Sequence, residues 1–254
     1  MIKLVSAGLT DVGLRRSNNE DAFLVMPEIG LFAIADGMGG AAAGEVASSY
    51  FVETARTVFT GRTPASEEND YGLIRNVFRQ TNERIFEHTA QHPDDEGMGC
   101  TGDLLLFHGD RYVIGHTGDS RVYLFRYGSL RQLTKDHSWV QFQVDQGMLT
   151  PEQARNHPRK NLILRALGTD PTVSFDMQEG RGMDGDIFLL CSDGLTEMVD
   201  DAGIQDMLGS VETIQQKVRN LIQTALAAGG RDNVTVILCE VQSVDSAETN
   251  GLRV

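Results

Sequence analysis

The sequence predicts an α+β fold in which two packed sheets carry helices on their outer faces. Strand-like apolar segments occur in consecutive runs, and segments of helical periodicity stand apart from them. The strict strand–helix alternation of a parallel sheet is absent. A chain of 254 residues that is 41% apolar can bury a large core without disulfide bonds. We therefore expect one domain over residues 1–241 and a disordered polar tail over residues 242–254.

The first part of the chain predicts three strands and then two helices. Apolar runs typical of strands cover residues 3–8, 21–26 and 31–36. Apolar side chains then recur every three or four residues over 43–59 and over 71–91, which is typical of amphipathic helices. The polar residues from Thr60 to Asp70 predict an exposed loop between those helices.

Residues 102–133 predict a meander of short antiparallel strands. Apolar and other residues alternate there, and Gly-containing turns such as Thr117-Gly118-Asp119 separate the strands. The polar residues 134–161 predict short helices, with Thr150 as an N-cap before Pro151. We interpret this segment as an insertion that lies over a sheet.

The last part of the chain predicts strands at 172–177 and 186–192, a helix, and a final strand at 233–241. The helix, residues 211–230, places Val211, Ile214, Val218 and Leu221 on one face and ends at two glycines.

Composition restricts the class of protein. The three cysteines, Cys100, Cys191 and Cys239, show no CxxC spacing, which favours reduced thiols over disulfides or a zinc site. The first residues lack the pattern of a signal peptide, and no run reaches the ~20 apolar residues of a membrane helix. A net charge of −14 disfavours nucleic acids and anionic membranes as partners. We expect a cytoplasmic monomer.

Aspartates adjoin apolar runs or Gly-containing turns at five places: Asp21, Asp36, Asp119, Asp193 and Asp232. Hard divalent cations prefer oxygen ligands, and carboxylates supply them. A glycine after Asp36 leaves the carbonyl of Gly37 free to approach an ion. A single Asp-Gly is usually only a turn. Two such pairs directly behind apolar strands favour a metal site instead.

Other catalytic patterns are absent from the sequence. The six histidines form no HExxH motif, and no GxxxxGK[ST] loop occurs. Ser192 lies in CSDG, not in the GxSxG of a nucleophile elbow, so we interpret it as a strand-end residue. Arg15 and Arg16 precede an acidic pair, and an arginine there can bind phosphate through two hydrogen bonds.

Six motifs together resemble the type-2C family of metal-dependent serine/threonine protein phosphatases, in its bacterial form. The motifs follow the family's order and are GLRRSNNEDAF, ADGMGG, GHTGDSRVYLF, LTKDHS, LLCSDGLTE and GGRDNVTV. The resemblance implies a β-sandwich of two mainly antiparallel sheets flanked by helix pairs, a four-layer αββα arrangement. It also implies a flap beside the active site over about residues 138–167.

The resemblance further implies a residue for each role. Asp36 would bridge two Mn²⁺ or Mg²⁺ ions, the Gly37 carbonyl would bind the first, and Asp193 and Asp232 the second. Asp119 and Asp193 would hold a third, weaker ion. Glu20 and Asp21 would hold water bound to the metals, and Arg16 would bind the substrate phosphate. The substrates would be phosphoserine and phosphothreonine in proteins, hydrolysed by a metal-bridging hydroxide, and serine/threonine kinases would be the functional opponents.

Two positions depart from the bacterial pattern. Ala41 stands where a histidine is usual, and Gly102 and Asp103 stand where small or hydroxyl residues are more usual. Ala41 leaves open a non-enzymatic alternative, a phosphatase-like protein that senses metal or binds phosphoproteins. A second alternative is a phosphatase for small phosphate monoesters. No role for Asp103 follows from the sequence.

Overall fold

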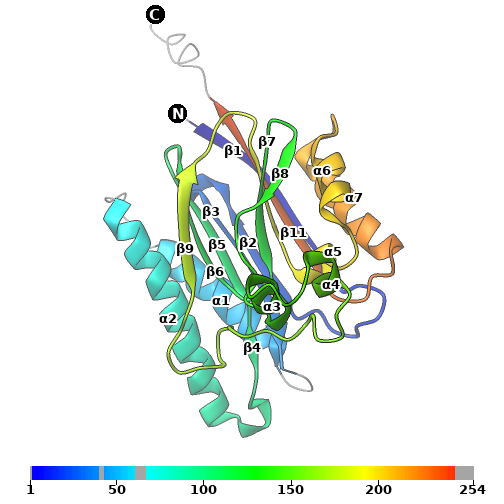
Figure 1. Cartoon of the computed structure of the whole chain (residues 1–254). Helices are drawn as coiled ribbons and strands as arrows, with labels where there is room; N and C mark the ends of the chain where they lie inside the picture. The colour runs from blue at the N-terminus through cyan, green and yellow to red at the C-terminus, as the bar shows by residue number, and fades with distance from the viewer. Residues whose placement is uncertain (1, 40–42, 61–66, 244–254) are drawn as a thin grey trace, which may run out of the picture.

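The structure, a computed structural model, describes residues 2–39, 43–60 and 67–243 (Figure 1). Ala41 lies outside these residues. Two antiparallel sheets pack face to face, and helices cover the outer face of each (Figure 1). The predicted four-layer αββα sandwich is therefore confirmed.

One sheet has five strands among the described residues, each antiparallel to its neighbours. In spatial order they are β1 (Ile2–Asp11), β11 (Val234–Ser243), β10 (Ile187–Cys191), β7 (Arg121–Arg126) and β8 (Ser129–Gln132). The first and last strands of the chain are thus neighbours.

The second sheet is built mostly from the first half of the chain. In spatial order its strands are β2 (Asp21–Met26), β3 (Leu31–Met38), β5 (Gly102–His108), β6 (Arg111–Thr117) and β9 (Asp176–Arg181), and the short β4 (Gly99–Cys100) pairs with the end of β3.

The helices divide between the two outer faces. Those on the second sheet are α1 (Gly44–Thr60) and α2 (Glu67–Gln91), and those on the first are α6 (Asp201–Leu208) and α7 (Ile214–Ala227). The remaining helices are α3 (Trp139–Asp145), α4 (Pro151–Arg155) and α5 (Asp193–Thr196), with the 3-10 turns η1 (Pro27–Ile29) and η2 (Pro93–Asp95). None of the helices within the described ranges combines the length and apolar character needed to cross a bilayer.

The central strands are continuously apolar because both of their faces are buried, one in the core between the sheets and the other under the helices. In β3, Phe32 and Ile34 face the other sheet, whereas Leu31 and Ala33 face α1 and α2. Because both faces are covered, neither set can be polar. Across the inter-sheet core, Phe188 packs edge-on against Phe107 and Tyr112, at centroid distances of 5.2 and 4.9 Å.

The Thr117-Gly118-Asp119 segment is not the hairpin turn that the meander predicted. β6 pairs with β5 and β9, whereas β7 pairs with β8 and β10 in the other sheet. The chain therefore crosses between the sheets at Gly118, and alternation of apolar residues cannot distinguish such a crossing from a hairpin. The crossing places Asp119 where the two sheets meet.

Several predicted boundaries were also wrong. α2 begins at Glu67, within the predicted loop, and residues 61–66 lie outside the described residues. β9 begins only at Asp176, and β11 continues through Ser243 into the predicted tail. Val211 is fully exposed because Thr213 caps α7 and the helix starts after it. The cap at Thr150 is confirmed: its hydroxyl accepts a hydrogen bond from the Gln153 amide.

Candidate metal centre

Two acidic residues of the second sheet lie side by side where β2 begins and β3 nears its end. Asp21 and Asp36 are register partners in the antiparallel pair. The Gly37 amide donates a hydrogen bond to the carbonyl of Glu20 at 3.0 Å, which holds the strand ends together. A Cβ on Gly37 would lie 2.2 Å from the Gly44 carbonyl oxygen, so only glycine fits. This packing gives Gly37 a structural reason, and the expectation that its carbonyl approaches an ion stays a prediction.

The first sheet contributes Asp193 and Asp232. Asp193 opens α5 directly after β10, and Asp232 lies two residues before β11. The two segments are packed tightly, because a Cβ on Gly194 would lie 1.9 Å from the Asn233 carbonyl oxygen. The pairing of β10 with β11 thus brings together two carboxylates that are far apart in the sequence.

Asp21 connects the two sheets through one carboxylate oxygen. Its Oδ2 accepts hydrogen bonds from the hydroxyls of Ser192, at 2.8 Å, and Thr235, at 2.6 Å. Its other oxygen, Oδ1, is buried and has no hydrogen-bond partner among the described residues. Buried polar atoms without partners are rare in proteins and indicate a missing water or ion. Ser192, which the sequence suggested was only a strand-end residue, therefore orients Asp21.

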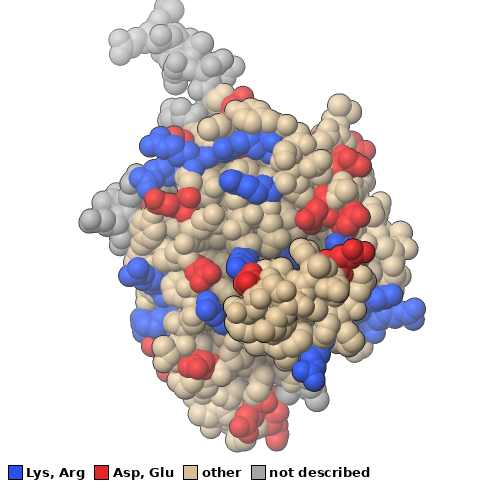
Figure 2. All heavy atoms as spheres, viewed as in Figure 1, with Lys and Arg blue, Asp and Glu red and all other residues tan. Residues whose placement is uncertain are grey.

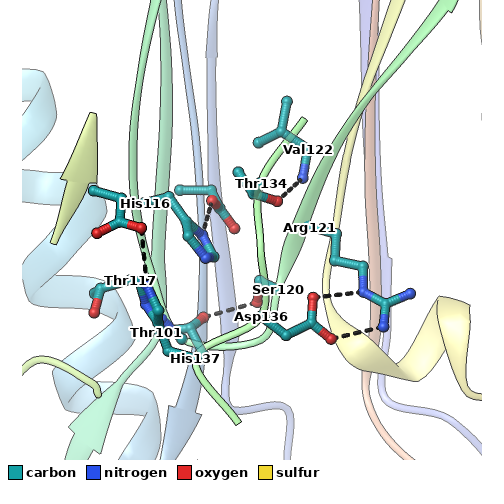
Figure 3. Close-up of polar contacts among 12 residues, drawn as sticks. Thr101, His116, Thr117, Ser120, Arg121, Val122, Thr134, Asp136 and His137 are labelled. Carbon is teal, nitrogen blue, oxygen red and sulfur yellow. Dashed lines mark hydrogen bonds and ion pairs between the residues drawn. The ribbon is translucent and has the colours of Figure 1, made fainter. Parts of the chain in front are cut away.

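Asp119 is joined to Asp36 through two hydroxyl side chains. Thr101 Oγ1 accepts from the Asp36 amide at 2.8 Å and lies 2.8 Å from Ser120 Oγ, in the residue after Asp119 (Figure 3). Sequence reasoning missed the positioning residues Thr101, Ser120, Thr235 and Asn233. Their position in the sequence could have indicated a role for three polar residues that each adjoin a candidate aspartate: Ser120, Ser192 and Asn233.

Burial and mutual repulsion raise the pKa of the clustered carboxyls. Desolvation is the largest cause for Asp21, whose pKa rises to about 6, and for Asp119, whose pKa rises to about 7. The pKa values of Asp36 and Asp193 are also raised, first by burial and then by neighbouring carboxylates of the cluster. Neither Asp36, Asp119 nor Asp193 forms an ion pair with the described residues.

Arg16 lies at the edge of the cluster and forms an ion pair with Asp232, at 2.7 Å. Its side chain is half exposed, and its pKa is raised by the hydrogen bond to Asp232 and by the charges of Glu20 and Asp36. The Glu20 carboxyl, whose pKa is raised by burial and by Glu45, lies nearby. The neighbouring Arg15 has no ion pair with the described residues, and the assignment of phosphate binding to Arg16 stays a prediction.

The donor set fits divalent cations in its chemistry, because hard cations prefer carboxylate oxygens. In the described part of the chain, however, no three Asp, Glu, His or Cys side chains are arranged closely enough around one point to bind a metal ion without adjustment. Asp232 is held by Arg16, and uncompensated carboxylates repel one another. Several acids packed together with few counter-charges are costly unless a cation binds among them. The orphaned oxygen of Asp21 supports the same assignment.

A cavity of about 570 Å³ adjoins the cluster. Asp119 and Asp193 line this cavity together with residues of the predicted flap, which include Val140, Ala154 and Lys160. The flap segment thus lies beside the acidic cluster, with α3 and α4 as its helices (Figure 1).

Comparison with known sequences then decides the family. The profile of the family described as Protein phosphatase 2C matches residues 15–238. The chain belongs to this family. The predicted family resemblance is therefore confirmed.

Similar proteins include named bacterial phosphatases. The chain is 42% identical to the serine/threonine protein phosphatase PstP of Mycobacterium tuberculosis, over 96% of this chain but 46% of that protein, so it spans about half of that relative's length. It is 38% identical to the serine/threonine phosphatase stp of Listeria welshimeri, covering 91% of this chain and 93% of that protein. A crystal structure of the PstP catalytic domain in complex with two manganese ions has a TM-score of 0.87 and 39% identity, and covers 96% of this chain and 100% of that one.

Proposed function

We propose that this chain is a Mn²⁺- or Mg²⁺-dependent phosphatase that hydrolyses phosphoserine and phosphothreonine in proteins and so opposes serine/threonine kinases. The observation that carries the proposal is the cluster of Asp21, Asp36, Asp119, Asp193 and Asp232, in which the only ion pair among the described residues is that of Asp232 with Arg16 at the edge. Family membership and the two manganese ions in the PstP catalytic domain support it.

We assign the residues to roles by their place in the cluster. Asp36 would contact both tightly bound ions, with the carbonyl of Gly37 on one and Asp193 and Asp232 on the other. Asp119, on the crossing between the sheets, would hold a third and weaker ion together with Asp193. Glu20 and Asp21 would hold water around the ions, a role that the free oxygen of Asp21 suits.

Paired divalent ions, when bound, supply a water of lowered pKa and stabilise charge on a transferring phosphoryl group. The protein's own contribution is to fix the carboxylates and to orient the phosphate. Arg16 reaches Asp232 with one nitrogen of its guanidinium, which leaves other donors of the fork for phosphate oxygens. Because Arg16 is half exposed, an incoming substrate can reach it.

We also propose that the chain acts as a cytoplasmic monomer without nucleic-acid or membrane partners. On the face drawn in Figure 2, several basic side chains form a band towards the upper edge, and basic and acidic side chains are both scattered over the rest. Arginines of β7 and β9 are neutralised by acids, as in the pairs Arg126–Asp186 and Arg181–Asp110. The net charge of −14 further opposes binding to polyanions.

Hydrolysis assays test the proposal and its alternatives. We expect phosphate release from a phosphothreonine peptide with Mn²⁺ and none with EDTA. The absence of turnover with Mn²⁺ on both a phosphopeptide and p-nitrophenyl phosphate would favour the non-enzymatic alternative. A much higher kcat/KM for small phosphate esters than for phosphopeptides would favour the small-molecule alternative.

A further inference from the structure

Asp103 and His116 form a buried pair that the proposed chemistry does not use. They are register partners on β5 and β6, and both side chains are almost inaccessible to solvent, at 0% and 2% exposure. Asp103 Oδ1 lies 2.7 Å from His116 Nδ1. A buried pair of this kind is weak evidence of a contribution to stability, because desolvation offsets the attraction. The pair therefore calls for another explanation.

The imidazole of His116 bridges two parts of the chain. Its Nε2 lies 2.9 Å from the carbonyl oxygen of Lys135, which only accepts hydrogen bonds, so Nε2 carries a hydrogen. The 2.7 Å contact between Nδ1 and the Asp103 carboxylate requires a second proton on one of the two groups, because two bare lone pairs would repel each other. With both ring nitrogens engaged, the ring cannot rotate without breaking a buried hydrogen bond.

Lys135 lies in the segment that leads from β8 into the flap. On either side of it, Thr134 and Asp136 bind to β7: Thr134 Oγ1 accepts from the Val122 amide, and Asp136 makes two hydrogen bonds with Arg121 (Figure 3). These contacts attach the segment to the first sheet. The bond from His116 to Lys135 attaches it to the second sheet.

His137, two residues after Lys135, connects this segment to Gly118, where the chain crosses between the sheets. Its ring stacks on that of His116, at a centroid distance of 4.7 Å. The His137 amide donates to the Gly118 carbonyl at 2.7 Å, and the Gly118 amide donates to His137 Nδ1 at 3.2 Å. Asp119 follows Gly118, and Ser120 is bound to Thr101 on the other side (Figure 3). Asp119 thus lies between two anchored residues.

We propose that the Asp103–His116 pair positions residues 134–137, which lead into the flap. Through His137 and Gly118, the pair also positions the carboxylate of Asp119. The pair is a positioning device and touches neither substrate nor ions. This inference rests on the proposed role of Asp119 at the third ion.

A double variant separates positioning from stability. In Asp103→Ala/His116→Phe, apolar groups of similar total volume replace the pair, so the fold should persist, as melting and circular dichroism would show. The bridge to Lys135 is lost. The matched control is Asp103→Asn, whose amide can donate to His116 Nδ1 and leave Nε2–H on Lys135.

Two measurements without substrate report on the site. In a calorimetric Mn²⁺ titration, we expect the double variant to keep its two tight ions and to bind the weakest ion about 10- to 100-fold less tightly, as when supporting partners of metal ligands are removed. Limited proteolysis within residues 138–167 should become faster. Asp103→Asn should behave like the wild type in both. A folded double variant with the wild-type isotherm and wild-type flap protection would overturn the inference.

Two further variants keep the test decisive. If the double variant does not fold, His137→Phe takes its place. This variant keeps the ring stack but cannot accept a hydrogen bond from the Gly118 amide, so we expect the same weakening of the weakest ion. An unchanged isotherm would refute the proposed path.

Asp119→Asn tests the assumption that Asp119 binds the weakest ion. If it leaves the weakest ion unchanged, the role of Asp119 is wrong and this inference falls with it. If it alone removes that ion, only the role of the pair is wrong.

Discussion

Asn233 and Glu20, which are 213 residues apart in sequence, are joined by a hydrogen bond of 2.8 Å from the Glu20 amide to Asn233 Oδ1. The Asn233 amide group donates in turn to the carbonyls of Val12 and Asn18, both at 2.9 Å. One buried side chain thus organises the loop that carries Arg16 and Glu20 and holds it against the segment that carries Asp232.

Replacing Asn233 should therefore destabilise the protein. In Asn233→Ala, one amide and two carbonyls lose their partner, and we expect the free energy of unfolding to fall by about 1–3 kcal/mol. Urea unfolding measures this change. Gln223→Ala, on the exposed side of α7, is the control and should leave the midpoint unchanged. Equal midpoints for the two variants would show that the loop does not depend on Asn233.

Neutralising single carboxylates of the cluster should abolish Mn²⁺-dependent hydrolysis without unfolding the chain. We expect this for Asp36→Asn, Asp193→Asn and Asp232→Asn, because each removes a charged group proposed to bind a metal ion while relieving repulsion among the clustered acids. Activity on a phosphopeptide and melting in EDTA are the two readouts. Asp206→Asn, on the exposed face of α6, is the matched control. Full activity in one of the three would remove that residue from the metal site.

The metal-free protein should lose stability as the pH rises. The pKa of Asp21 is raised to about 6 and that of Asp119 to about 7, against about 3.9 in an unfolded chain. Between these values the folded state binds more protons than the unfolded state, so the unfolding free energy falls with increasing pH. In EDTA, we expect a higher melting temperature near pH 5 than near pH 7.5.

Added Mn²⁺ should reverse this trend, because the ions favour the ionised carboxylates. We therefore expect Mn²⁺ to raise the melting temperature more at pH 7.5 than at pH 5. Asp119→Asn should flatten the EDTA profile, since it removes one of the titrating groups. A profile in EDTA that rises from pH 5 to pH 7.5 would contradict the raised pKa values.

Arg16 should matter for turnover and little for stability. Its ion pair with Asp232 is half exposed, and such pairs contribute little to folding. Loss of a charged hydrogen bond to the phosphate should lower kcat/KM roughly 10- to 100-fold in Arg16→Ala. Mn²⁺ binding should be unchanged or tighter, because Asp232 is released. Arg15→Ala is the control, and an equal loss of kcat/KM in both variants would argue for a general charge effect.

The sequence predicted the sandwich and the candidate aspartates because both depend on local patterns. Apolar runs that end in Asp-Gly at Asp36 and Asp193 mark strand ends, and motif order indicated the family. The spatial assembly of Asp21, Asp36 and Asp193 is a prediction that the burial and mutual repulsion of their carboxyls support.

Other features could not be predicted because they depend on contacts between distant segments. The chain crosses between the sheets after β6 because β6 pairs with β9 and β7 pairs with β10. Both of these partner strands follow later in the chain. Asp103 looked unexplained because its partner, His116, is opposite it only in the folded register. Val211 had the right spacing for α7, but the cap at Thr213 began the helix after it.

The carboxylates are divided between the two halves of the sandwich: Asp21 and Asp36 belong to one, and Asp193 and Asp232 to the other. A small sliding of one sheet over the other would change the distances between the carboxylates of the two sheets. It would leave the hydrogen bonds between the strands of each sheet intact. The aromatic contacts of Phe188 with Phe107 and Tyr112 resist such shear. Interior residues remote from any substrate thereby help to set the geometry of the candidate metal site.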